Sequence, residues 1–154
     1  MLPEDADTIL VLDDEAQLLD TTWELVRIGY TPPRGHLRGG MRTWRTSGRA
    51  LARVPTVSVH DIRDGLDRYH VLDVRQPAEW AEGHAPGAQF ITGAELTRRH
   101  DEVPRDRTVL TVCGSGYRSS VAASYLRRQG HDDVVNLLGG MSAWLAEDLP
   151  VDTA

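Results

Sequence analysis

The sequence predicts an α/β fold in which helices cover both faces of a parallel β-sheet. Short apolar runs rich in β-branched residues, such as residues 108–112, alternate along the chain with stretches of helical character. Strands that alternate with helices favour parallel pairing, because each helix carries the chain back to the same end of the sheet. An almost wholly apolar strand is typical of a sheet buried on both faces.

An internal repeat supports the same fold class. Residues 8–13 (Thr-Ile-Leu-Val-Leu-Asp) resemble residues 108–113 (Thr-Val-Leu-Thr-Val-Cys), and the helical stretches that follow stop at Gly29 and Gly130. Glycine ends a helix there because it adopts the left-handed conformation at little cost. The match then continues, with a one-residue slip, through Gly39, Gly40, Met41 and Trp44 in the first copy and Gly139, Gly140, Met141 and Trp144 in the second. Each copy is a strand–loop–helix–strand–helix unit.

The second copy is preceded by elements that the first copy lacks. In chain order we expect a strand at 56–59, a helix at 61–66, a strand at 71–74, a helical turn at 78–82, a loop at 83–88, a strand at 89–91 and a helix capped by Thr92 that runs through Leu96 toward Arg99. Residues 56–152 then form a complete α/β domain. Residues 1–50 form only the second half of another, and residues 51–55 link the two.

Composition narrows the function classes. The net charge of −6 argues against a nucleic-acid binder, which needs clustered positive charge. The chain has no apolar run long enough to cross a bilayer and no basic, apolar N-terminal signal, so we expect a cytoplasmic protein without a membrane contact. The histidines show no metal-ligand spacing, and we expect no metal.

Cys113 is the strongest candidate for chemistry. It comes directly after a buried strand, at the edge of a parallel sheet where ligands bind. The small residues Gly114, Ser115 and Gly116 let backbone N–H groups converge on one centre, and Arg118 and the start of the next helix add positive charge. Such surroundings lower the pKa of a thiol and stabilise a thiolate. A lone cysteine is more often a buried core residue, but this loop favours a functional one.

These residues resemble the active-site loop of the rhodaneses, a superfamily of thiosulfate and persulfide sulfurtransferases. The matching segments are Cys113-Gly114-Ser115-Gly116-Tyr117-Arg118-Ser119, Leu72-Asp73-Val74-Arg75 with Glu79, Gly83-His84-Ala85-Pro86-Gly87-Ala88, and Gly139-Gly140 with Trp144. The resemblance implies the rhodanese fold, with five parallel strands flanked by helices. It also implies that Cys113 carries sulfur as a persulfide, that residues 114–119 bind the substrate, and that Arg118 closes the loop. No cofactor is expected apart from this covalent intermediate.

Loop length separates the related chemistries. Phosphatases and arsenate reductases of this fold place the arginine six residues after the cysteine, whereas Arg118 is the fifth residue after Cys113. The single basic residue in the loop leaves the donor open between thiosulfate and a low-molecular-weight persulfide. Because the chain has one cysteine, sulfur must leave to an external thiol, sulfite or cyanide in a ping-pong scheme. The alternative is a non-catalytic regulatory or docking module of the same fold.

Four further residues are expected to support the site rather than react. Asp73 and Arg75 follow a predicted strand, and we expect hydrogen bonds and an ion pair with Glu79 that hold the loops together. His84 lies in a turn next to Pro86 and Gly87, which favours a structural hydrogen bond over general-base chemistry.

The first copy is predicted to be inactive. Asp13 takes the place of the cysteine, acidic residues replace the small ones, and Leu18 stands where the arginine would be. A half-domain also has an unpaired strand edge. Two explanations stay open: the chain is the tail of a longer protein, or the edge pairs with another subunit in a homo-oligomer. The arrangement resembles the C-terminal part of fusions with a metallo-β-lactamase-fold persulfide dioxygenase, so a dioxygenase domain is a possible partner.

Overall fold

The computed structural model describes residues 6–153. The chain forms two compact units, Met1–Ala52 and Arg53–Ala154, and each is described by itself. Within the described residues, no helix is both long enough and apolar enough to span a membrane.

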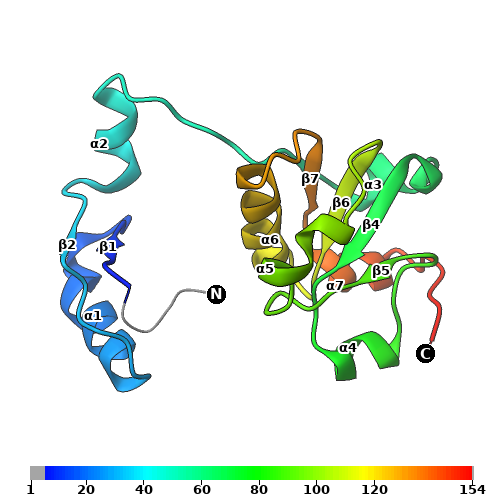
Figure 1. The fold of residues 1–154 in the computed structure, drawn as a ribbon, viewed down its shortest axis with the longest axis horizontal. Coiled ribbons are helices and arrows are strands. Elements are labelled where there is room, and N and C mark those ends of the chain that lie inside the picture. Colours follow the sequence, from blue (N-terminus) through cyan, green and yellow to red (C-terminus); the bar gives the residue numbers. More distant parts are fainter. Residues whose placement is uncertain (1–5, 154) are drawn as a thin grey trace. The chain divides into compact units, whose positions relative to one another are not determined.

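The second unit is built on the predicted five-stranded parallel sheet, with strand order β3-β7-β6-β4-β5 (Figure 1). The strands are β3 (Thr56–Val57), β4 (Tyr69–Asp73), β5 (Gln89–Phe90), β6 (Thr108–Val112) and β7 (Val134–Leu137). The helices are α3 (Val59–Ile62), α4 (Pro77–Glu82), α5 (Leu96–Arg99), α6 (Tyr117–Arg128) and α7 (Gly140–Ala146). Short 3₁₀ turns, η2 (Leu66–Arg68) and η3 (His100–Glu102), connect them. The fold class is therefore α/β, as the alternation of elements predicts.

Successive strand residues serve two separate cores, one on each face of the sheet. Leu72 of β4 and Val109 of β6 pack with Leu126 of α6 on one face. Their neighbours Val71 and Leu110 pack on the other face with α3 and α7. This alternation follows from the two-residue period of a strand, and it explains why the runs contain few polar residues.

Several predicted boundaries are wrong by a few residues. The strand expected at 71–74 is β4, which starts at Tyr69 and ends at Asp73, and the helix expected from a cap at Thr92 is α5, which starts at Leu96. Residues 56–59 were expected to form a strand, but β3 ends at Val57 and Val59 already begins α3. The reason is a capping box, in which Ser58 and Asp61 each bond the backbone of the other. The expected helix at 61–66 correspondingly lies earlier, and Leu66 begins the turn η2 instead.

Within residues 6–52, the first unit forms a strand–helix–strand–helix segment. Its elements are β1 (Ile9–Leu10), the 3₁₀ turn η1 (Glu15–Gln17), α1 (Leu18–Arg27), β2 (Gly35–His36) and α2 (Gly40–Thr46). The two strands pair in parallel and form a sheet of their own. In residues 6–52, Gly40 is the only buried residue, so this unit has almost no core.

Matching hydrogen bonds relate the first unit to the end of the second. The Trp44 indole donates to the carbonyl of Ala50 at 3.0 Å, and the Trp144 indole donates to that of Pro150 at 2.9 Å. The helix ends match in the same way. The Tyr30 amide donates to Leu25 at 3.1 Å and the His131 amide to Leu126 at 3.0 Å. The repeat read from the sequence is thus also a repeat of contacts.

The strand register corrects one detail of that repeat. Leu10 pairs with His36 and Thr111 pairs with Asn136, which places Leu12, two residues after Leu10, at the position of Cys113. A Cβ added to Gly40 would lie 2.3 Å from the Leu12 carbonyl oxygen, just as one added to Gly140 would lie 2.2 Å from that of Cys113. The expectation that Asp13 replaces the cysteine is therefore wrong. Asp13 corresponds to Gly114, because the one-residue slip lies in the loop after α1.

Candidate active site

Cys113 lies at the carboxyl end of the central strand β6 and is completely buried. The chain turns through residues 114–116 and enters α6 at Tyr117. Gly116 makes this turn possible with a φ of +93°, a left-handed conformation that favours glycine. A side chain at this position would also meet the carbonyl oxygen of Leu137 at 3.0 Å. The turn thus aims the first amides of α6 back at the cysteine.

The Cys113 sulfur is surrounded by hydrogen-bond donors. The Gly116 amide donates to Sγ at 3.1 Å, and the Ser119 hydroxyl donates to it at 3.3 Å. Burial raises the pKa of the thiol, but hydrogen bonds from the Ser119 hydroxyl and from the amides of Ser119, Ser115 and Gly116 outweigh it and lower the pKa below its ordinary value. The loop therefore favours a sulfur anion, as the sequence predicts.

The first turn of α7, which starts at the Gly139-Gly140 pair, holds the backbone of this loop in place. The Met141 amide donates to the carbonyl of Cys113 at 2.7 Å. The amide and the hydroxyl of Ser142 both donate to the Gly114 carbonyl at 2.9 Å. Gly140 must lack a side chain because its Cα faces the Cys113 carbonyl at close range. The carbonyl oxygens of the loop are thus held away from the sulfur, and its amides are left to face it.

Two buried polar side chains complete the support. The Asn136 amide donates to the Gly116 carbonyl at 3.1 Å, and the Thr111 hydroxyl lies 3.1 Å from the Ser119 carbonyl. Sequence reasoning missed Asn136, Thr111 and Ser142. A polar residue inside an otherwise apolar strand, as at Thr111 and Asn136, is the signal that could have found two of them.

Arg118 forms a two-pronged ion pair with Glu79, with both N–O distances at 2.7 Å. The hydrogen bond from Arg118 lowers the pKa of Glu79 to about 2, and Glu79 in turn raises that of Arg118. Asp73 and Arg75 were expected to form an ion pair with Glu79, and this expectation is wrong. Asp73 and Arg75 bond each other, which leaves the carboxylate of Glu79 to the loop arginine.

Asp73 and Arg75 form a buried ion pair with each other, in agreement with the structural role that the sequence predicts for them. Arg75 Nε donates to both carboxylate oxygens of Asp73, at 3.0 and 2.9 Å, and its Nη2 donates to the Gly83 carbonyl at 2.7 Å. The pair ties the end of β4 to the loop after α4, the helix that carries Glu79. It therefore fixes both ends of the segment that contains Glu79.

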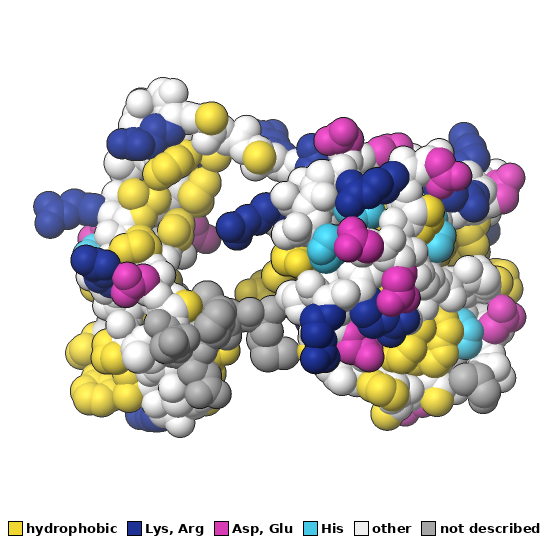
Figure 2. Space-filling view, in the orientation of Figure 1, with side chains coloured by type: hydrophobic (Ala, Val, Ile, Leu, Met, Phe, Trp, Pro, Cys, Tyr) yellow, Lys and Arg dark blue, Asp and Glu magenta, His cyan; other side chains and the backbone are white. Residues whose placement is uncertain are grey.

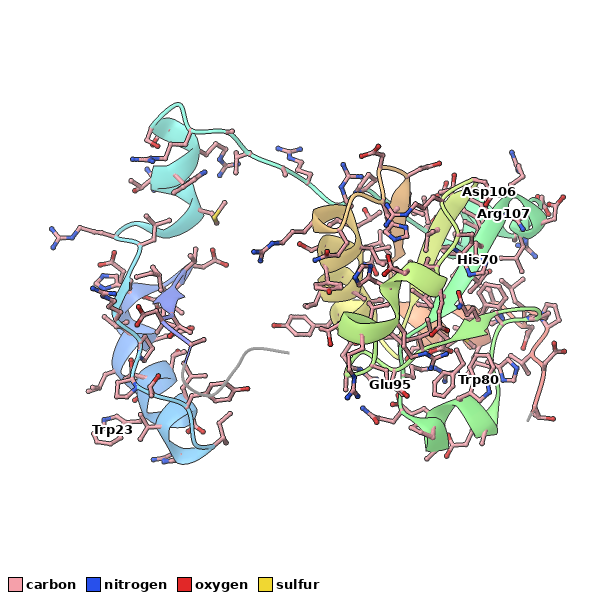
Figure 3. The ribbon with its side chains drawn as sticks, in the orientation of Figure 1. Trp23, His70, Trp80, Glu95, Asp106 and Arg107 are labelled. Atoms are coloured by element: carbon pink, nitrogen blue, oxygen red, sulfur yellow. The ribbon has the colours of Figure 1, made fainter. Side chains whose placement is uncertain are left out.

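His84 is also structural. Its ring stacks on Trp80, labelled in Figure 3, with ring centroids 3.4 Å apart, and its Nδ1 lies 3.1 Å from the Trp80 carbonyl oxygen. Its backbone pairs with Asp152 in an isolated bridge. These contacts fix the loop after α4, and they agree with the structural hydrogen bond expected from the Pro-Gly turn.

The remaining loop residues differ in exposure. Ser115 is exposed and contributes its amide. Tyr117, two residues later, is 78% exposed. Ser119, expected to bind substrate, is fully buried and contacts the sulfur itself. Within the described residues, no group of three or more histidine, cysteine or acidic side chains is placed to hold a metal ion.

Comparison with known proteins agrees with this geometry. The profile of the rhodanese-like domain family matches residues 58–147. A sulfurtransferase of Allochromatium vinosum is 42% identical over 81 residues, which cover 53% of this chain and 76% of that protein. A thiosulfate sulfurtransferase (GlpE) of Pseudoalteromonas translucida is 35% identical over 92 residues, which cover 58% of this chain and 88% of that protein.

The solved structure of a rhodanese-related protein from Thermoplasma volcanium is 29% identical and superposes with a TM-score of 0.62. The superposition covers 65% of this chain and 99% of that one. The family profile lies within the unit that contains Cys113 and covers more than half of the chain. The chain belongs to the rhodanese-like domain family.

Proposed function

We propose that the second unit is a sulfurtransferase that carries sulfane sulfur as a persulfide on Cys113. The observation that carries this proposal is the position of Sγ, at the focus of the Gly116 amide and the Ser119 hydroxyl. A donor set of this kind stabilises a thiolate before transfer and an anionic persulfide after it.

The reaction runs in two displacements. The Cys113 thiolate attacks the outer sulfur of the donor and forms a new S–S bond with it. The S–S bond that joined this sulfur to the rest of the donor breaks, and sulfite or a thiolate leaves with the electron pair. An external thiolate, sulfite or cyanide then attacks the outer sulfur of the persulfide, and the Cys113 thiolate is released. Neither step needs a general base once the thiolate exists, which fits the structural contacts of His84.

We expect the donor to reach this sulfur past Arg118 and Glu79, at an entrance beside Gly114. A Cβ added to Gly114 would meet the Arg118 guanidinium at 3.0 Å and the Glu79 carboxylate at 3.5 Å. The Arg118 side chain is 44% exposed, so an anion can reach it from the solvent. We expect Arg118 to exchange Glu79 for the donor anion as the donor reaches Sγ.

The net charge of Arg118 and Glu79 at this entrance affects which sulfur donor is preferred. Glu79 neutralises Arg118, and no second arginine lies within residues 113–119. A compact dianion such as thiosulfate gains less from a neutralised arginine than from a free one. A persulfide of a small thiol, whose other charges lie farther from the sulfur, fits this entrance better.

The test is steady-state sulfur transfer with thiosulfate and, separately, with glutathione persulfide, each with cyanide as the acceptor. We expect parallel lines in double-reciprocal plots for the wild-type chain, the pattern of a ping-pong scheme, and no turnover by Cys113→Ser. Turnover that persists in Cys113→Ser would overturn the proposal. So would a chain that transfers sulfur from neither donor.

A further inference from the structure

Two polar side chains lie inside the sheet of the second unit. Thr111 of β6 and Asn136 of β7 pair with each other in the strand register, and they are 0% and 3% exposed. In the view of Figure 2, by contrast, arginine and acidic side chains of this unit lie beside one another on its surface. A buried polar side chain costs stability unless it is hydrogen-bonded. Packing alone does not account for two polar residues at these positions.

The side chain of Asn136 is only half satisfied. Its Nδ2 donates to the carbonyl oxygen of Gly116 at 3.1 Å. Its Oδ1 is buried and, within the part of the chain that the structure describes, has no hydrogen-bond partner. An apolar side chain of similar size would avoid the cost of that unpaired oxygen. The bond to Gly116 is what asparagine provides at this position and leucine would not.

Thr111 contacts the same end of α6. Its hydroxyl lies 3.1 Å from the carbonyl oxygen of Ser119 and 3.2 Å from that of Val135. A hydroxyl has one proton, so it donates to one of these two carbonyls at a time. The Thr111 hydroxyl therefore lies between the first turn of α6 and strand β7.

The two residues that Asn136 and Thr111 contact are the ones that bond the sulfur. The Gly116 amide and the Ser119 hydroxyl donate to Cys113 Sγ at 3.1 and 3.3 Å. Asn136 and Thr111 contact these residues through their carbonyl oxygens, which cannot donate to the sulfur. The contacts therefore fix both residues without competing with the sulfur for their hydrogens.

The first unit lacks this polar pair. Leu10 and His36 occupy the positions of Thr111 and Asn136 in the strand register. The same unit has no cysteine, and Leu18 replaces the serine that bonds the sulfur. The close approach of a glycine to the loop, in contrast, is present in both units. The polar pair thus occurs with the thiol and not with the backbone arrangement alone.

We propose that Thr111 and Asn136 are positioning residues for the sulfur, and that each acts through one donor. Asn136 holds Gly116 so that its amide points at Sγ, and Thr111 holds the start of α6 so that the Ser119 hydroxyl reaches Sγ. Both contacts stabilise a negative charge on the sulfur. Their role in sulfur transfer rests on the proposed function, whereas their role in stabilising the thiolate does not.

The experiment measures the rate at which iodoacetamide alkylates the full chain as a function of pH, with Cys113 as the only thiol. Thr111→Val removes the hydroxyl and keeps the shape of the side chain, and Asn136→Leu removes both polar atoms at similar size. We expect each change to move the alkylation profile to higher pH by about half a unit or more, because a displaced donor stabilises the thiolate less. Urea unfolding should show little loss of stability in Asn136→Leu, since the unpaired oxygen is removed as well.

Two controls separate positioning from packing. Thr108→Val removes a hydroxyl from the same strand, one that bonds Asp133, and it should leave the alkylation profile unchanged. In a Ser119→Ala background the shift caused by Thr111→Val should shrink by about half or more, while the shift caused by Asn136→Leu should persist. This difference follows because Asn136 acts through Gly116.

Sulfur transfer from glutathione persulfide to cyanide gives a second readout. We expect kcat to fall about threefold or more in Thr111→Val and in Asn136→Leu, with a smaller change in KM, because the donors act on the anion during transfer. A wild-type chain that transfers no sulfur would refute the proposed function, and the alkylation profiles would still decide whether Thr111 and Asn136 position the donors.

The positioning role would be overturned by alkylation profiles that stay in place in Thr111→Val and Asn136→Leu, since the two residues would then only contribute to packing. An equal shift in Thr108→Val would overturn it as well. So would a shift in Thr111→Val that is just as large in the Ser119→Ala background.

Discussion

The loops after β1 and β6 have similar backbone contacts but different side chains. Each loop contacts a Gly-Gly pair: Gly40 lies close to the carbonyl oxygen of Leu12, and Gly140 lies close to that of Cys113. In the loop after β6, backbone amides donate hydrogen bonds to the Cys113 thiol. In the loop after β1, the carboxylate of Glu15 accepts a hydrogen bond from the Gly39 amide at 2.6 Å.

The difference indicates that the shape of the loop and the stabilisation of a sulfur anion are separable properties. The close approach of glycine to the loop is needed for the shape of the turn, and it is kept where no thiol is present. Stabilisation of an anion needs in addition Gly116 and Ser119, which in the first unit are replaced by Glu15 and Leu18. Three acidic residues, Asp13, Asp14 and Glu15, would also repel an anionic donor.

The largest expected effect comes from moving the thiol between the two loops. Cys113→Ser should lower sulfur transfer by about a thousandfold or more, because a hydroxyl does not carry sulfane sulfur. Adding Leu12→Cys to that variant should restore nothing, since the acidic loop neither lowers the thiol pKa nor admits the donor. Activity assays and alkylation rates of the double variant measure this. Recovered turnover would show that the two loops are chemically equivalent.

Gly140→Ala and Gly40→Ala separate scaffold from chemistry. Each adds a Cβ within 2.3 Å of a carbonyl oxygen, at a φ of +54° for Gly140 and +56° for Gly40. We expect Gly140→Ala to lose at least about tenfold in kcat, because a displaced loop misplaces its donors. Gly40→Ala should disturb only its own unit and leave transfer unchanged. Circular dichroism and kcat of both variants check this, and equal losses of kcat would contradict the separation.

Ser119→Ala removes one donor from the sulfur. Hydrogen bonds hold the pKa of Cys113 below its ordinary value, so the thiolate and its activity appear as pH rises through that lowered pKa. Loss of a hydrogen bond to a charged group, about 1.5 kcal/mol, should raise the pKa by roughly one unit and move this limb to higher pH. The pH dependence of iodoacetamide alkylation measures the shift.

The control for this prediction is Ser120→Ala, whose hydroxyl bonds the Tyr117 carbonyl and not the sulfur. It should leave the alkylation profile where it is. An unshifted profile in Ser119→Ala would mean that the amides alone hold the thiolate.

The smallest expected effect is on donor preference. Glu79→Gln frees the charge of Arg118, so the ratio of kcat/KM for thiosulfate to that for glutathione persulfide should rise a few-fold, roughly 1 kcal/mol or less in this exposed setting. Glu82→Gln, on the exposed side of the same helix, is the matched control. A ratio that stays constant, or that falls, would remove Glu79 from donor selection.

Much of the fold could be predicted because its signals are local. Residues 108–112 are a strand in the structure as in the prediction, and α6 stops just before Gly130 as a helix must where glycine ends it. Gly139 and Gly140 were recognised as a repeated motif. The reason for the motif is the close approach of Gly140 to the carbonyl oxygen of Cys113. That approach depends on the folded structure and cannot be predicted from the spacing of residues in the sequence.

The site was predictable in its loop and less so in its partners. Small residues between Cys113 and Arg118 indicate an amide cradle on chemical grounds alone. The partner of Glu79 depends on whether Asp73 and Arg75 already satisfy each other, which only the folded geometry decides. The equivalence of Leu12 and Cys113 likewise needed the strand register, since a one-residue insertion after α1 is compatible with either alignment.

The most direct measurement is the intact mass of the protein after exposure to a sulfane donor without an acceptor. The wild-type chain should gain one sulfur atom, which peptide mapping places on Cys113 and cyanide removes. The gain should be absent from Cys113→Ser, and Leu12→Cys in the same background should not restore it. A wild-type chain that gains no sulfur, or a Cys113→Ser, Leu12→Cys chain that does, would contradict the assignment of the sulfur chemistry to the loop after β6.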